Sequence, residues 1–136
     1  MNRRYSKYSN LSDYLFNLLD VSDKIDIPPQ KLKLLIEYND FYLPMASAIL
    51  SVLYPNSFSI YDYRVCDELQ KYLETTKYHR IKNCKFERLW DGYEDSLEKV
   101  ILISGKKTYR EADNFLWGKS FYDQLFNSIG NRFLKA

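Results

Sequence analysis

Asp62 is the residue of this sequence whose type and setting best suit chemistry. It follows a short segment that begins after Pro55, and it directly precedes residues 63–73, where apolar side chains recur at helical spacing. A carboxylate at the start of a helix is stabilised by the helix dipole. Such a group activates water, or stabilises the positive sugar that develops when an N-glycosidic bond breaks. The same position also suits a simple helix cap, worth roughly 1 kcal/mol, and both roles stay open.

Three tyrosines and an arginine flank this acid and are the candidate substrate-binding residues: Tyr54, Tyr61, Tyr63 and Arg64. Aromatic rings stack on nucleobases with ~1–3 kcal/mol each, and enzymes that act on a base first turn it out of the duplex. Packing in the core is the alternative for the tyrosines. Arg64 suits a phosphate contact, an ion pair with Asp67 or Glu68, or a buried ion pair with Asp113 that braces the fold.

Clusters of basic residues are the candidate nucleic-acid contacts. The first has no acid within it and the second follows Gly105; their members are Lys77, Arg80, Lys82 and Lys85, then Lys106 and Lys107. Phosphate contacts from such residues supply most of the affinity for nucleic acid. Ordinary solvated surface is the alternative. The totals of 20 basic and 18 acidic residues, a net charge of +2, do not decide between them.

The helix that must position Asp62 is predicted over residues 45–54. This stretch is almost entirely apolar, with Ser47 and Ser51 as its polar members. Pro44 suits the first turn of a helix, and Pro55 cannot continue one. A helix this apolar is expected to be central and buried on most sides.

The whole chain is expected to be all-α, with about six or seven helices in one domain of 136 residues. Only four glycines and four prolines argue against a turn-rich β fold. Residues 1–10 read as a loose basic arm. Thr108 and Glu111 form a capping box before the last helix. The segment 99–104 is the exception, because its composition also suits a strand.

Several classes are excluded by what the sequence lacks. No apolar run is long enough to span a membrane, and no secretory segment follows Met1. Cys66 and Cys84 lack the CxxC spacing, so free buried thiols in a cytoplasmic protein are expected. With His79 they do not make a convincing metal site. The common nucleotide-binding, hydrolase and zinc-protease motifs are absent, and no cofactor is expected.

Three stretches resemble the helix-hairpin-helix DNA glycosylase superfamily, and more closely a set of its small relatives. They are residues 43–50 with 54–55, residues 60–64, and more weakly residues 110–117. In that family a hairpin leads into a helix and a loop then presents a catalytic aspartate, which this resemblance places at Asp62. The family's nucleophilic lysine falls at Pro44, which implies a monofunctional enzyme. The hairpin matches residues 40–43, where the family's glycine pair is missing.

Two functions follow as expectations. The first is a nucleic-acid-associated helical protein resembling a monofunctional base-excision glycosylase, with DNA as its partner. The second is a non-catalytic protein-binding module, or an inhibitor, that retains the helical fold and uses exposed tyrosines as its interface. A small-molecule pocket near Asp62 is a third option. The oligomeric state is left open by the sequence.

Overall fold

The protein is built from α-helices throughout the part that the structure, a computed structural model, describes, namely residues 11–73 and 85–135. The helices are α1 (Leu11–Asp23), α2 (Pro28–Ile36), α3 (Leu43–Leu53), α4 (Tyr63–Leu73), α5 (Phe86–Ser104) and α6 (Tyr109–Lys135). No strand occurs in these ranges, so the all-α prediction is confirmed. Residues 99–104 are helical, and the predicted arm of residues 1–10 lies outside the described ranges.

The helix ends follow local signals in the sequence. Prolines occupy the first turns of α2 and α3, where the missing N–H removes no hydrogen bond. Gly105 ends α5 in the left-handed conformation, with φ of 67°. The N–H of Glu111 donates to Oγ1 of Thr108 at 3.2 Å, which confirms Thr108 as the cap of α6.

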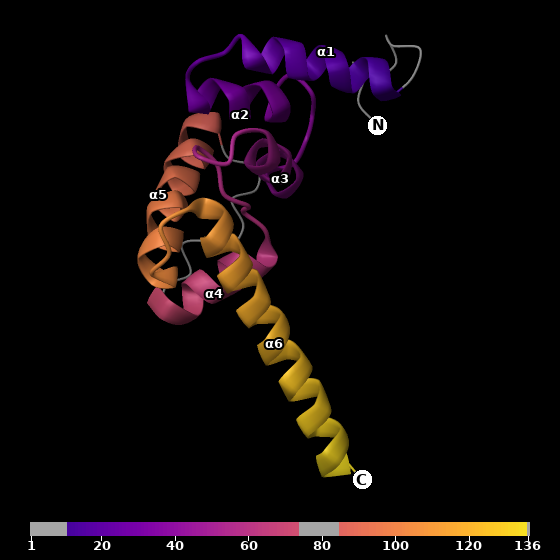
Figure 1. The fold of residues 1–136 in the computed structure, drawn as a ribbon, viewed down its shortest axis with the longest axis vertical. Coiled ribbons are helices and arrows are strands. Elements are labelled where there is room, and N and C mark those ends of the chain that lie inside the picture. The colour runs from indigo at the N-terminus through magenta and orange to yellow at the C-terminus, as the bar shows by residue number, and fades with distance from the viewer. Residues whose placement is uncertain (1–10, 74–84, 136) are drawn as a thin grey trace.

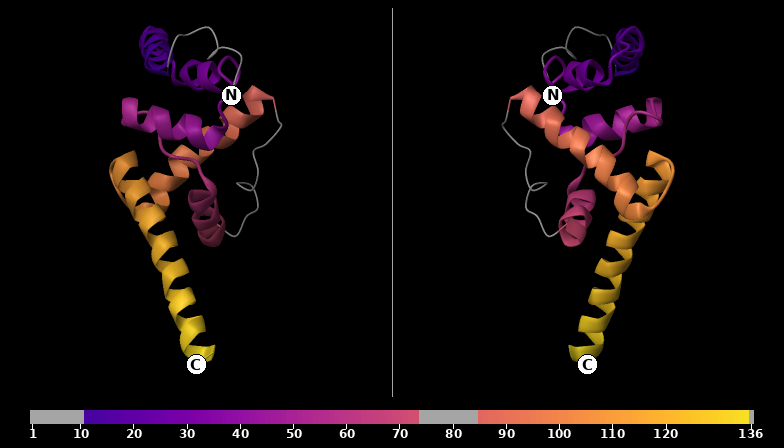
Figure 2. Two further views of the ribbon diagram at one scale, coloured as in Figure 1. Left: turned by 90° about the vertical axis from the view of Figure 1, so that its right-hand side faces the viewer. Right: turned by 90° about the vertical axis from the view of Figure 1, so that its left-hand side faces the viewer.

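The helices pack around one apolar core (Figures 1 and 2). The α1–α2 pair lies at one end, α3 lies next to α2, and α5 runs along the body toward α4 and the first turns of α6. Every helix contributes to the core; examples that are at most 4% exposed are Tyr14, Leu35, Leu50, Val65, Tyr93 and Leu116. None of the described helices is long and apolar enough to cross a membrane.

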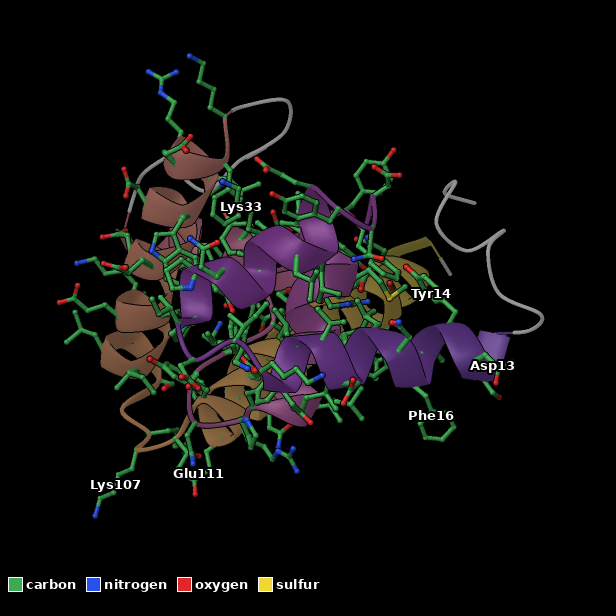
Figure 3. All side chains as sticks on the ribbon, turned by 90° about the horizontal axis from the view of Figure 1, so that it is seen from above. Asp13, Tyr14, Phe16, Lys33, Lys107 and Glu111 are labelled. Carbon is green, nitrogen blue, oxygen red and sulfur yellow. The ribbon has the colours of Figure 1, made fainter. Side chains whose placement is uncertain are left out.

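The burial of α3 is narrower than predicted. Its inner face, with Ala46 and Ser47, is fully covered, but Met45 is 57% exposed and Val52 70%. The outer face is exposed because α1 does not pack closely against it, and an apolar groove of about 340 Å³ lies between the two helices. The groove is lined by Leu15, Leu18, Leu19, Ser22, Leu35, Ile49, Leu50, Val52 and Leu53. On the far side of α1, Phe16 points away from the body (Figure 3).

The last helix leaves the body partway along its length. Ala112 and Leu116 are fully buried, whereas the side chains of residues 121–131 are largely exposed. The two side views agree that this half of α6 extends past every other helix (Figure 2). Its packing against α4 and α5 is therefore confined to about its first half, up to Phe121 and Asp123.

Substitutions of Asp40 test the backbone geometry of the turn between α2 and α3. It has a left-handed backbone, with φ of 59°, and the next N–H, that of Phe41, donates to the carbonyl of Leu35 at 3.0 Å. Aspartate tolerates this conformation better than alanine does, and glycine tolerates it best. We predict that Asp40→Gly raises the free energy of unfolding by up to about 1 kcal/mol and that Asp40→Ala lowers it by about 1 kcal/mol, measured by urea denaturation. Equal stability of the two variants would contradict this turn geometry.

Candidate functional site

The segment between α3 and α4 is held by side chains rather than by secondary structure. The N–H of Ser59 donates to the Tyr93 hydroxyl at 3.1 Å, and that hydroxyl donates to the Ser59 carbonyl at 2.6 Å. The N–H of Ile60 donates to Oδ2 of Asp113 at 3.1 Å, and the Ser59 hydroxyl donates to Oδ1. The N–H of Tyr61 donates to Oγ of Ser47 at 2.9 Å. We call these contacts the loop junction.

Tyr93 is the centre of this junction. Its side chain is fully buried on α5, and its ring contacts Phe58, Tyr61 and Trp90 at centroid distances of 6.4, 6.1 and 5.7 Å. Burial raises the pKa of Tyr93, so its phenol stays neutral and keeps the proton that it donates to Ser59. Tyr93 therefore holds Ser59 by two hydrogen bonds while its ring packs in an aromatic cluster.

Asp113 is the acid of the junction, and it is 7% exposed. Burial raises its pKa to about 6; the hydrogen bonds from Ser59 and Ile60 oppose this rise, and the charge of Asp62 adds to it. From the sequence, Asp113 was expected only as a partner of Arg64. Its helical spacing from the buried Leu116, three positions on, was the signal that it faces inward.

Asp62 caps α4. Its Oδ1 accepts the N–H of Val65 at 3.0 Å, and its carbonyl accepts the N–H of Cys66 at 3.0 Å, the first bond of the helix. This is the geometry of an N-cap, so the capping role left open by the sequence is confirmed. No contact among the described residues assigns Asp62 to chemistry, and its catalytic role stays a prediction.

The three candidate tyrosines do not gather around Asp62, contrary to the grouping that the sequence suggested. Tyr54 turns toward the end of α1, where its hydroxyl donates to Asp23 at 2.5 Å and lies 3.0 Å from the Ser22 hydroxyl. Tyr61 is buried against Tyr93, whereas Tyr63 is 65% exposed on α4. They separate because the extended segment and the first turn of α4 send successive side chains in different directions.

Arg64 packs on aromatic rings instead of reaching Asp113. Its guanidinium carbon lies 4.9 Å from the Trp117 ring centroid, 5.2 Å from that of Tyr63 and 5.8 Å from that of Phe121. The Asp113 carboxylate is instead occupied by the loop. Cation–π contacts of this kind contribute about 0.5–2 kcal/mol. Arg64 therefore braces α4 against α6, the structural role that the sequence left open.

The predicted basic residues do not form one patch within the described ranges. Lys85 precedes α5, whereas Lys106 and Lys107 follow it. A helix of 19 residues separates them by roughly 28 Å. Lys107 projects away from the body (Figure 3), and the ammonium of Lys106 lies 5.8 Å from the Phe115 ring centroid. Lys77, Arg80 and Lys82 lie outside the described residues.

Glu68 is a buried acid on α4 that the sequence suggested only as an ion-pair partner of Arg64. Glu68 is fully buried; Lys71 lies 3.0 Å from its Oε1 and Lys119 lies 3.4 Å from its Oε2. Lys119 also binds Asp123 at 2.9 Å, and this hydrogen bond lowers the pKa of Asp123. Glu68 lies three residues after the buried Val65, so helical spacing indicated that it faces inward. Its partner on α6, Lys119, is too distant in sequence for the pairing to be inferred.

Two clefts open beside the loop junction. Their volumes are about 480 and 230 Å³, and both are lined by Ile60, Asp113 and Asn114. The larger adds Arg110 and Ser51, and the smaller adds Trp117 and Val65. Asp62 lines neither of these two clefts, so the pocket expected near it lies by Asp113 instead. Within the described ranges, no cluster of three or more metal-ligating side chains exists.

Cys66 is a free, buried thiol on α4, as the sequence predicted. Burial raises its pKa to about 11, so the thiol carries its proton at neutral pH. Cys84 lies outside the described residues. Cys66 is therefore a packing residue rather than a nucleophile.

The cap can be tested by replacing its carboxylate. We predict that Asp62→Ala lowers the free energy of unfolding by about 1 kcal/mol, because the N–H of Val65 loses its acceptor. Asp62→Ser should recover most of this loss, because a hydroxyl caps nearly as well. Guanidinium denaturation of both variants measures the effect. Full stability of Asp62→Ala would show that the cap contributes nothing.

Asp113 should make stability depend on pH. Burial raises its pKa in the folded state to about 6, above the ordinary value of 3.8 for an aspartate, so the folded state holds a proton that the unfolded state releases. The contribution of Asp113 to stability is therefore greatest below pH 4 and falls as the pH rises to 6, by up to about 3 kcal/mol. We predict that Asp113→Asn removes this part of the dependence in urea denaturation at a series of pH values. Superimposable profiles of the two proteins would contradict the role of this acid.

Comparisons with protein-family models, with curated proteins and with solved structures returned no match. The relationship to the helix-hairpin-helix glycosylases stays a prediction. The segments that suggested it do meet in the fold, since residues 43–50, 60–64 and 110–117 supply Ser47, the held loop and Asp113.

Proposed function

We propose that this chain is a non-catalytic protein-binding module whose binding surface lies on the projecting half of α6. The observation that carries the proposal is a row of large apolar side chains, which we call the α6 stripe. Its members are between 47% and 64% exposed: Phe121, Tyr122, Leu125, Phe126 and Ile129. Their spacing of three and four residues places them along one side of the helix.

This surface has the composition of an interface. Aromatic side chains are enriched at the centres of protein interfaces, and contiguous apolar patches mark interaction sites. Single exposed apolar residues are ordinary on soluble proteins, but a row of five on a helix that leaves the body is not. A helix that presents an apolar face in this way suits a groove or a second helix on the partner.

The electrostatics of the projecting half favour a protein over a nucleic acid. Between Ser120 and Asn131 the sequence has a single charged residue, Asp123, and Lys119 already binds it at 2.9 Å. Phosphate recognition needs several cations in one place. An apolar, nearly uncharged face offers none, whereas it suits burial against another apolar face.

A glycosylase-like activity is the alternative proposal, and the position of Asp62 at a helix start supports it. Asp62→Ser separates the two, because it retains a cap and removes the carboxylate. A non-catalytic module releases no base from duplexes that carry damaged or mismatched bases. Base release by the parent chain that Asp62→Ser lacks would overturn the proposal and favour the alternative.

The protein-binding surface can be located by photocrosslinking. We predict that a photoreactive phenylalanine analogue at position 126 forms covalent adducts with a protein partner. The full chain that carries the analogue is expressed in cells of its source organism. The matched control is the same analogue at Gln124, which is exposed on the opposite side of the helix. An adduct at position 126 that is absent at position 124 supports the module. Equal adducts at both positions, or none at either, would contradict it.

A further inference from the structure

We infer that the partner of the α6 stripe is a second copy of this chain, with the two projecting helices packed side by side in opposite directions. This inference rests on the proposed function, because it names the partner of the same surface. It follows from three features of α6: the spacing of its apolar residues, the direction in which it leaves the body, and the apolar area that it leaves exposed.

The spacing is that of a helix pair. Tyr122, Phe126 and Ile129 follow one another by four and then three residues, and the sequence continues the pattern with Phe133. Alternation of three and four is the repeat by which two helices interlock. In an antiparallel pair with its two-fold axis between positions 127 and 128, residue 126 of one copy meets residue 129 of the other. Position 122 then meets position 133, so every layer joins two apolar residues.

The direction of the helix selects the antiparallel arrangement. The stripe begins where α6 leaves the body, because Arg64 on α4 still contacts Phe121. The other helices of the described ranges, α1 to α5, all lie at that end of α6 (Figure 1). Two parallel copies would bring both bodies to the same end, where they compete for space. Antiparallel copies place the bodies at opposite ends and leave the two stripes free to meet.

The exposed area is enough for an association of moderate strength. Aromatic side chains bury about 150–250 Å² each when fully covered, and Leu and Ile bury somewhat less, so three aromatic and two aliphatic residues that are about half exposed offer roughly 500 Å² per copy. A pair would bury about 1,000 Å², the lower limit for a specific interface. The only acid in this stretch, Asp123, is bound by Lys119. Residues 124–131, around the proposed two-fold axis, carry no charged side chain, so like charges do not oppose the approach there.

Light scattering coupled to gel filtration tests the dimer. Over a concentration series the chain of 16.3 kDa should shift from its monomer mass toward twice that mass. Phe126→Glu should remain monomeric, because it places a charge at the centre of the pair. Gln124→Glu, the same change on the opposite side of α6, should still dimerise. Circular dichroism verifies that both variants keep the helical fold.

The distance between two spin labels, one on each copy, shows whether the two α6 helices pack antiparallel or parallel. A label at position 114, introduced as Asn114→Cys with Cys84→Ser, should give a distance near 40 Å in an antiparallel pair, from the helical rise. A parallel pair would give less than about 20 Å and would overturn the inference. A monomer at every concentration would also overturn it. The proposed function fails separately: a chain that is monomeric at every concentration but forms photocrosslinks from position 126 to a different protein would retain the module and overturn the dimer.

Discussion

The structure depends on burying a stretch of chain that has no secondary structure of its own. Ser59, Ile60 and Tyr61 run through the interior, and each buried N–H or carbonyl that lacks a partner costs about 1–3 kcal/mol. The hydroxyls of Tyr93 and Ser47 and the carboxylate of Asp113 supply partners from three different helices. The loop junction therefore fixes α3, α5 and α6 relative to one another, which apolar packing alone would not do, because it is non-directional.

This constraint explains an acid that is otherwise costly to bury. A carboxylate with a pKa of about 6 is only partly stabilised by its two hydrogen bonds, and it weakens the folded state at neutral pH. The structural use of this acid is that one carboxylate accepts two hydrogen bonds, one from the Ser59 hydroxyl and one from the Ile60 N–H. The same reasoning applies to Glu68, whose burial is offset by Lys71 and Lys119. Both acids connect the first half of α6 to the body.

Local signals in the sequence predicted the fold well, and distant contacts limited the prediction of the site. Pro44 and Thr108 mark helix starts because their effects act within one turn. The cap by Asp62 was foreseeable for the same reason. The bonds between Ser59 and Asp113 join residues 54 positions apart, and no periodicity reports such a pairing. Tyr54 lies near Asp62 in sequence, yet its hydroxyl binds Asp23, because a helix end and an extended segment intervene.

The anchoring of α6 bears on how its exposed half works. Arg64 lies against Trp117 and Phe121, and Lys119 contacts Glu68 and Asp123, so the helix is held on two sides just before it leaves the body. A stripe presented on a helix that is already formed loses little conformational freedom when it binds. A flexible tail of the same sequence would have to order itself first, at about 1–2 kcal/mol per residue. The buried polar contacts between α4 and α6 thus contribute to association as well as to folding, because they keep the apolar surface in one orientation.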